Sequence, residues 1–412
     1  MLIHASTLRF ILLAALLLLI PFGGADSALA LLFKIVFLTV GGAAFLDSVL
    51  MMVRKGRLQF LAAMATCFSS VIFFSLALNI ENYEFNAMMD ALSLALIVHI
   101  PIFTYNAFRT VQQLFSFYKL IQALVVIIVA CSVYQMLTGM DPIFSNPLAG
   151  GRITGPFSWG APVVGSFLGL VFASLYVWVK QGYFVAYAVA SLTTLAFIVL
   201  GGNRSVLVII IVAYLFILFS KPLFSASMHQ VGLIIVLSVF GLLYGVGSAQ
   251  FEGVSGNVEY RLNSLLSGQV VGEQKTKRIA TWRQSLCMVE DFPLFGVGVG
   301  RFEEELDNYL ECSPESEGSM PHPHQVHLEI LSTTGIFGLL IFLMYSAKVF
   351  QISVLRQWGS LEGKFALITV FIVLSPMNVT HGLVSLWWAV SCFIMIGLAI
   401  VSSKFKGKNN EI

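Results

Sequence analysis

The sequence is a series of apolar runs, each about 20 residues long and each ended by a short polar or glycine- and proline-containing break. Hydrophobic residues make up 58% of the 412 residues and charged residues only 11%, whereas soluble domains contain about 25% charged residues. Inside a bilayer every backbone N–H and C=O must be satisfied within the segment, which an apolar helix achieves. The chain therefore predicts an all-α polytopic membrane protein.

The breaks divide the chain into about twelve transmembrane helices. One large polar segment interrupts the series between the ninth and the tenth span. This predicts three parts: helices one to nine in residues 1–249, a large loop in 250–325, and helices ten to twelve with a short tail in 326–412. The spans are expected at 8–23, 28–51, 59–80, 88–107, 118–138, 159–179, 183–200, 204–220, 230–249, 326–347, 364–380 and 384–403.

Lysine and arginine occur in every second break, which sets the expected orientation. Residues such as Arg54, Lys180 and Lys221 lie in one set of breaks, and Glu81 and Asp141 lie in the intervening set. By the positive-inside rule, both termini are cytoplasmic and the large loop lies outside. The formal net charge of +2 says little about partners; we expect the lipid bilayer as surroundings and no nucleic acid.

The first span has a second interpretation as a signal peptide. Arg9 precedes a short apolar run, and Ala28-Leu29-Ala30 has the small residues of a cleavage site. Cleavage would leave about eleven spans. We expect an uncleaved helix.

The large loop contains two segments with the spacing of amphipathic helices. The apolar face of the first comprises Ile279, Trp282, Leu286 and Val289, and that of the second comprises Phe302, Leu306, Tyr309 and Leu310. A tryptophan on such a face favours a helix in the headgroup plane. Cys287 and Cys312 also lie in this loop and could pair in an oxidising compartment, although the sequence leaves their pairing open.

Arginines on the expected outer side are candidate anion ligands. Asn203 follows a glycine turn as a helix cap, and the helix after it directs free N–H groups and a positive dipole end outward. Arg204 adds a planar donor fork suited to phosphate. Arg152, in a glycine- and proline-rich loop, could contact phosphate or sugar. For both arginines the alternative is an interfacial anchor.

Three of the seven histidines lie in the segment Pro321-His322-Pro323-His324-Gln325-Val326-His327-Leu328-Glu329. An imidazole has an ordinary pKa near 6.5 and suits general-base catalysis at neutral pH. If a helix has begun by His324, His327 lies one turn further on the same face. The spacing also permits zinc, but no cysteine or distinctive aspartate accompanies the histidines, so we expect no metal. A solvated loop without a catalytic role is the third interpretation.

Several segments, in their order and spacing, resemble the O-antigen ligase and O-antigen polymerase superfamily. They are Asn203-Arg204-Ser205, Tyr260-Arg261-Leu262, Arg278-Ile279-Ala280-Thr281-Trp282, Pro293-Leu294-Phe295-Gly296-Val297-Gly298, and His324-Gln325-Val326-His327-Leu328-Glu329 with Gly335. The resemblance covers the second half of the chain in detail. It covers the whole chain in span number and in the position of one large loop. The family pattern has asparagine where this chain has Gln325.

The resemblance implies a metal-independent glycosyltransferase without cofactors, at the periplasmic face of the bacterial inner membrane. Such an enzyme moves a glycan from undecaprenyl diphosphate to an acceptor hydroxyl, for example of lipid A core. It implies His324 as the base, with Arg204 and Arg278 at the leaving diphosphate, where fixed donors stabilise developing charge. Further substrate contacts are assigned to Arg261, Arg152, His327 and Arg283.

Three other functions remain as alternatives. A polymerase that joins lipid-linked repeat units would use the same donor and differ only in its acceptor. A secondary transporter also commonly has about twelve spans, but it would have a long loop between its two halves, where this chain has only Lys180-Gln181-Gly182. An inactive scaffold is disfavoured by the set of arginines and histidines.

Overall fold

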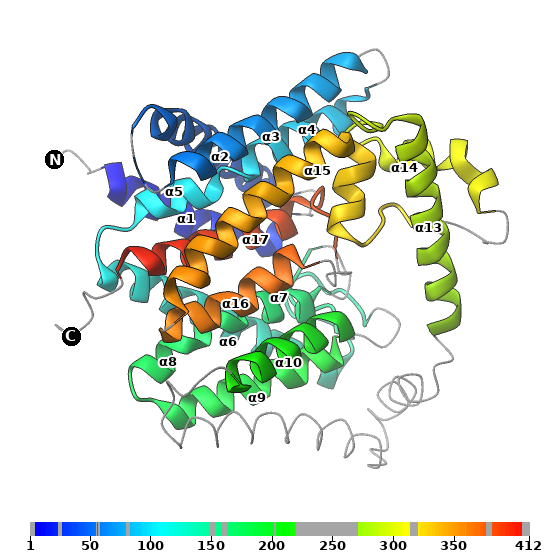
Figure 1. The fold of residues 1–412 in the computed structure, drawn as a ribbon. Helices are drawn as coiled ribbons and strands as arrows, with labels where there is room; N and C mark the ends of the chain where they lie inside the picture. Colours follow the sequence, from blue (N-terminus) through cyan, green and yellow to red (C-terminus); the bar gives the residue numbers. More distant parts are fainter. Residues whose placement is uncertain are drawn as a thin grey trace.

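The computed structural model describes residues 5–23, 27–54, 56, 58, 59–79, 83–148, 153–158, 163–201, 203–219, 271–313, 320–358, 360–375 and 381–405. These residues form helices and no β-strand, apart from a single bridge between Met140 and Pro147 (Figure 1). The helices are α1 (Ala5–Leu19), η1 (Ile20–Phe22), α2 (Ala28–Val53), α3 (Gln59–Leu78), α4 (Phe85–Ile97), α5 (Ile100–Ala107), α6 (Val111–Thr138), α7 (Val164–Val171), η3 (Phe172–Leu175), α8 (Tyr176–Lys180), α9 (Phe184–Leu200), α10 (Arg204–Phe219), α13 (Val271–Asp291), α14 (Phe302–Glu305), η4 (Leu306–Cys312), α15 (Val326–Ser353), η5 (Leu355–Gln357), α16 (Leu361–Leu374) and α17 (Leu386–Lys404).

Helices occupy the predicted spans, except for 230–249, which lies outside the described residues. Within the described part of the chain, six helices are long and apolar enough to cross a membrane, and the bent pair α4 and α5 makes a seventh. The other apolar helices are shorter. The chain is therefore a multi-pass membrane protein, and the total of about twelve spans stays a prediction.

The bend between α4 and α5 has a local cause in the sequence. The two helices meet at 43°, and Pro101, which lacks a backbone N–H, lies in the first turn of α5. His99 at the break is fully buried, with Nδ1 2.9 Å from the hydroxyl of Ser48 and Nε2 2.9 Å from that of Ser69. The fourth predicted span is thus two helices whose junction is held by polar contacts to α2 and α3.

The N-terminal helix α1 is part of the bundle. Arg9 on α1 donates two hydrogen bonds to the carboxylate of Asp47 on α2, at 2.7 and 3.0 Å. Asn106 on α5 donates a third to the same carboxylate at 3.2 Å. A partly buried ion pair of this kind is favourable only when further hydrogen bonds satisfy the remaining lone pairs, as they do here. An uncleaved first helix remains our expectation.

The last helix, α17, forms the centre of the bundle (Figure 1). Nearly all of its residues are buried, and it packs against α4, α5, α7, α15 and α16. Its apolar side chains face every neighbour, as expected of a helix that is hydrophobic all round. The segment that precedes α17 is therefore held near the centre of the bundle.

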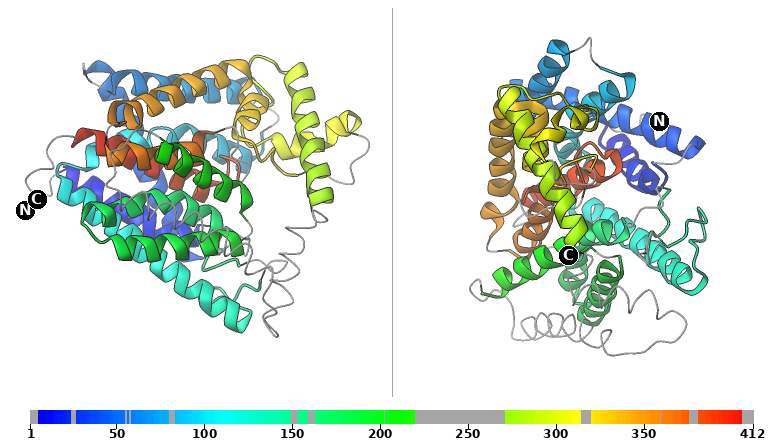
Figure 2. Two further views of the ribbon diagram at one scale, coloured as in Figure 1. Left: turned by 60° about the horizontal axis from the view of Figure 1, so that its bottom comes forward. Right: turned by 90° about the vertical axis from the view of Figure 1, so that its right-hand side faces the viewer.

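The helix α13 lies across one end of the bundle, nearly crosswise to the long helices (Figure 2). The beginning of α1 and the end of α17 lie at the opposite end (Figure 2). This arrangement agrees with a chain whose two termini share one side and whose large loop lies on the other. It also agrees with the predicted in-plane helix.

The two amphipathic segments of the loop differ in outcome. The second is confirmed in its main part: Phe302, Leu306 and Tyr309 are buried in a small core with Met288 and Val297, although Leu310 is 52% exposed. In the first, two residues of the predicted apolar stripe face away from the protein, as expected of a helix in the headgroup plane. Ile279 and Leu286 are 37% and 51% exposed, whereas the buried residues are Ala280, Thr281, Gln284, Ser285 and Met288.

The buried face is made of small and polar residues, of which Thr281 accepts a hydrogen bond from the backbone N–H of Met320, and this leaves Ile279 and Leu286 of the apolar stripe facing outward. Such a stripe suits a helix at a membrane surface. Cys287 on α13 and Cys312 at the end of η4 form a disulfide. It ties the crosswise helix to the following segment and resolves the pairing that the sequence left open.

Candidate active site

A break in α15 receives the glycine-containing segment that follows α13. Gly335 has φ +68° and ψ −170° inside the helix, a region that is open almost only to glycine. Around it the two segments exchange backbone hydrogen bonds. Val297 and Gly298 donate to the carbonyls of Ser332 and Thr333 at 2.9 and 3.0 Å, and Ile336 donates to that of Pro293 at 2.9 Å.

Both glycines at this junction are required by close approach of the backbones. A Cβ on Gly335 would lie 2.2 Å from the carbonyl carbon of Leu294. A Cβ on Gly296 would lie 2.3 Å from that of Thr333, and Gly296 also has a positive φ of +68°. The Pro-Leu-Phe-Gly-Val-Gly motif is therefore a docking segment for the broken helix.

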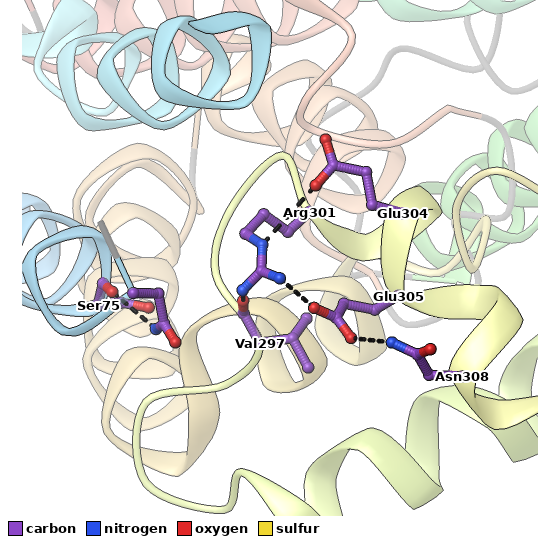
Figure 3. Close-up of polar contacts among 7 residues, drawn as sticks. Ser75, Val297, Arg301, Glu304, Glu305 and Asn308 are labelled. Atoms are coloured by element: carbon purple, nitrogen blue, oxygen red, sulfur yellow. Dashed lines mark hydrogen bonds and ion pairs between the residues drawn. The ribbon is translucent and has the colours of Figure 1, made fainter. Parts of the chain in front are cut away.

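Contacts to the N-terminal helices fix the other side of this segment. Ser75 at the end of α3 donates a hydrogen bond to the carbonyl of Phe295 at 3.0 Å. Arg301 extends between the carbonyl of Val297 and the carboxylates of Glu304 and Glu305 (Figure 3). The carboxylates of Glu304 and Glu305 thus hold Arg301 in place.

The crosswise helix α13 in turn positions the histidine segment. The indole Nε1–H of Trp282 donates to the carbonyl of Pro323 at 2.8 Å. The hydroxyl of Thr281 accepts a hydrogen bond from the backbone N–H of Met320 at 2.9 Å. Two consecutive residues of α13 therefore hold the chain on both sides of His322. The sequence placed Trp282 on the apolar stripe of the helix and did not predict that its side chain acts as a hydrogen-bond donor.

Three histidines and one arginine come together under α13. The rings of His322 and His324 are in contact, with centroids 3.9 Å apart. His324 has φ +54°, a left-handed backbone conformation that is uncommon outside glycine. Electrostatic interactions link His322 with His324, His381 and Arg278, and His381 with His324. Two of the predicted catalytic residues, Arg278 and His324, thus belong to one cluster.

Burial keeps the imidazoles of His322 and His381 neutral. Desolvation, followed by the neighbouring His324, His381 and Arg278, lowers the pKa of His322 to about 3. Desolvation, followed by His324, lowers the pKa of His381 to about 4. Burial also lowers the pKa of Arg278, although a guanidinium remains charged at neutral pH. The cluster therefore combines a permanent cation with the neutral imidazoles of His322 and His381.

Two nitrogen atoms of the cluster are buried without a hydrogen-bond partner among the described residues. They are Nε of Arg278 and Nδ1 of His322. Leaving a buried polar atom unpaired costs about 1–3 kcal/mol, and such atoms occur where a ligand supplies the partner. We therefore expect the missing partner of both atoms to be a ligand that binds at this cluster.

Sequence reasoning missed His381, which lies in the segment before α17. Its ring packs against Trp387 and Trp388, with centroids 5.1 and 5.6 Å apart. The loop after it is held by the buried carboxylate of Glu329 on α15. This carboxylate accepts hydrogen bonds from the backbone N–H groups of Leu383 at 3.0 Å and Val384 at 3.4 Å. The only signal in the sequence was a histidine in an otherwise uncharged outer turn.

His327 lies apart from the contact between His322 and His324. The helix α15 begins at Val326, with Gln325 as its cap accepting a hydrogen bond from the N–H of Leu328. The helix has therefore not begun by His324, so the expected shared face does not form. The ring of His327 packs against Phe342 instead, 5.9 Å between centroids. Gln325 takes the capping role that suits an asparagine.

The structure describes only some of the remaining predicted site residues. Arg204 is the first residue of α10, as expected from its cap, and the side chain of Asn203 before it accepts a hydrogen bond from Ser166 at 2.9 Å. The side chain of Arg204 lies outside the described part. So do Arg152 and Arg261. Arg283 is described and is exposed on α13.

The zinc alternative required three ligands in one group. Among the residues that the structure describes, no three histidine, cysteine, aspartate or glutamate side chains are arranged so that they could hold a metal ion. His322 and His324 are adjacent, whereas His327 turns toward Phe342.

Comparison with known families yields one match. Residues 189–343 match the family model described as O-Antigen ligase. The match begins in α9 and ends in α15, so it includes Arg278, His322, His324 and the docking segment. It confirms the resemblance to the O-antigen ligase superfamily. Among curated proteins, no match is found.

Proposed function

From the O-antigen ligase match at residues 189–343, we propose that this chain transfers a glycan from undecaprenyl diphosphate to an acceptor hydroxyl at the outer face of the membrane. The observation that carries the proposal is the cluster of Arg278, His322, His324 and His381. It joins a cation, neutral imidazoles and two unpaired buried nitrogens. Such a site suits a substrate that brings both negative charge and a hydroxyl proton.

In the proposed reaction, the acceptor oxygen attacks the anomeric carbon of the donor glycan. The bond between that carbon and the diphosphate oxygen breaks, and the electron pair leaves with the diphosphate. The acceptor proton passes to the imidazole of His324. Arg278 binds the departing diphosphate, whose charge grows as the bond breaks. A fixed donor in a buried site stabilises that charge more strongly than water would.

Two features support a site on the periplasmic side. The cluster lies with α13 at the end of the bundle opposite the beginning of α1 and the end of α17. The disulfide between Cys287 and Cys312 is typical of an oxidising compartment such as the periplasm. The outward apolar stripe of α13 would rest at the headgroups of the outer leaflet, where a lipid diphosphate also lies.

Arg204 is the proposed second ligand of the diphosphate. It opens α10, so the free backbone N–H groups and the positive end of the helix dipole add to its charge. Arg152, Arg261, Arg283 and His327 remain proposed contacts to the glycan or to the lipid carrier. Lipid A core is the proposed acceptor. A second lipid-linked repeat unit is the alternative acceptor, which would make the chain a polymerase.

The test uses purified protein in lipid vesicles with undecaprenyl diphosphate-linked glycan, and either lipid A core or a second lipid-linked unit as acceptor. A chelator is present in a parallel set of reactions. Product on lipid A core supports a ligase, and lengthened lipid-linked product supports a polymerase. Absence of product with both acceptors would refute glycan transfer.

The cluster is tested by His324→Ala and Arg278→Lys, with Arg356→Lys as the matched control. We expect His324→Ala to abolish transfer and Arg278→Lys to reduce it strongly, because lysine keeps the charge and loses the donor fork. Arg356 is exposed on η5, so its substitution should leave the rate unchanged. Full activity of His324→Ala would remove this residue from the proton transfer.

A further inference from the structure

A cavity of about 770 Å³ lies between α6 and the turn that joins α8 to α9. On α6 it is lined by Phe115, Lys119, Ala123 and Val126, which share one helical face. Trp178 and Lys180 of α8 line the other wall. The residues belong to the first half of α6 and to the end of α8, and none of them is part of the histidine cluster. Nothing in the proposed transfer reaction uses this cavity.

The lining changes from charged to apolar along the cavity. Lys119 and Lys180 mark one end, and Val126, about two turns deeper along α6, is 67% exposed at the other. The helix α6 has the length and composition of a membrane span, so an exposed valine at this depth faces lipid chains. The cavity thus suits a molecule with an anionic head and an apolar tail.

Charge in the cavity is incompletely balanced. Lys180 forms an ion pair with Glu362 and lies over the ring of Phe115, 5.7 Å from its centroid. Lys119 is exposed and pairs with no described acidic residue. Two lysines and one glutamate leave a single positive charge, which matches the single negative charge of a phosphodiester.

A hydrogen-bond donor in the wall also lacks its acceptor. The Nε1–H of Trp178 is buried and has no partner among the described residues. The indole ring is fixed beside Tyr183, 6.3 Å between centroids, so the donor has a defined position. Trp178 lines the same cavity as the unbalanced lysine. A phosphate oxygen would satisfy both groups at once.

We propose that this cavity binds one anionic phospholipid of the cytoplasmic leaflet. The headgroup phosphate lies between Lys119, Lys180 and the indole N–H of Trp178, and an acyl chain follows Ala123 and Val126 into the bilayer. The leaflet follows from the lysine-rich breaks on this side of the chain. Basic pockets between membrane helices are known receptors for anionic headgroups, and each lysine near the surface contributes about 1 kcal/mol.

The test is native mass spectrometry of the full-length protein purified in detergent and titrated with phosphatidylglycerol or phosphatidylcholine. The variants are Lys119→Gln and Trp178→Phe. The second keeps an aromatic ring at this position and removes the N–H donor. Lys348→Gln is the matched control, because Lys348 is also a helical lysine near an aromatic ring, that of Phe60, and is half-buried. Thermal unfolding of each variant checks that the fold is retained.

We expect the wild type to retain one phosphatidylglycerol in preference to phosphatidylcholine. Lys119→Gln should weaken this binding about fivefold, Trp178→Phe should weaken it as well, and Lys348→Gln should not. Equal retention of the two lipids, or equal binding by Lys119→Gln and Lys348→Gln, would overturn the proposal. So would displacement of the lipid by soluble glycerol phosphate, which would show that the cavity binds the phosphate alone.

Discussion

Gly335→Ala is the most informative change to the scaffold of the site. At this residue α15 breaks, and the segment 293–298 docks into the break. An alanine Cβ would lie 2.2 Å from the carbonyl carbon of Leu294 and 2.4 Å from the nitrogen of Phe295. Both are backbone atoms and cannot move aside as a flexible side chain can. The first part of α15, residues 326–334, joins the break to the turn that carries His324, so a shift at the break moves the helix that leads to the proposed base.

The expected cost has two parts. A non-glycine residue at φ +68° and ψ −170° costs about 1–3 kcal/mol of backbone strain. Forcing a methyl group into a close-packed contact adds about 1–3 kcal/mol. The free energy of unfolding should therefore fall by about 2–6 kcal/mol, out of the roughly 5–15 kcal/mol of a typical domain.

Gly139→Ala is the matched control for the strain. Gly139 ends α6 with φ +84°, and a Cβ there would meet no atom within 4 Å. Its substitution should cost only the strain of a left-handed residue, about 1–2 kcal/mol. The difference between the two variants therefore measures the contact with the docking segment.

The assay is thermal unfolding in detergent, with glycan transfer measured below both unfolding midpoints. We expect Gly335→Ala to unfold at a clearly lower temperature than Gly139→Ala and to lose transfer even where it is folded. Gly296→Ala should behave like Gly335→Ala, and the double variant should be less destabilised than the sum of the two, because both changes break one contact. Equal midpoints for Gly335→Ala and Gly139→Ala would refute the reasoning.

Three further predictions concern the crosswise helix and the cluster. Cys287→Ser and Cys312→Ser should each lower the free energy of unfolding by about 3 kcal/mol, and a double variant that is much less stable than either single one would contradict their pairing. Trp282→Phe should lower the free energy of unfolding by only about 1 kcal/mol. It should reduce the rate of glycan transfer more strongly, because it frees the segment next to the proposed base. The measurements are the transfer rate and the unfolding midpoint of the same variant. The pKa values of His322 and His381 are lowered to about 3 and 4, so the unfolded chain binds more protons than the folded chain below about pH 6.5. The free energy of unfolding should therefore be highest above that pH and should fall toward pH 4. An unfolding midpoint that rises on acidification would contradict the burial of these imidazoles.

The sequence alone determined the elements of this protein. Apolar length locates the spans, because a chain in lipid has few ways to satisfy its backbone, and each of these ways is local. The expectation that Arg278 and His324 share a site came from the family resemblance, whereas the helical spacing of α13 and the start of α10 at Arg204 came from local patterns. Each of these signals spans only a few turns of chain.

The tertiary structure decided what lies next to what. His381 enters the cluster because Glu329 on α15 binds the backbone of the loop before α17, and no local pattern records an interaction across that distance. The packed face of α13 was likewise decided by hydrogen bonds to the segment 320–323 rather than by apolarity. The spacing of apolar residues along a helix indicates which of its faces differ in polarity. Which face turns inward depends on partners that only the folded chain brings together.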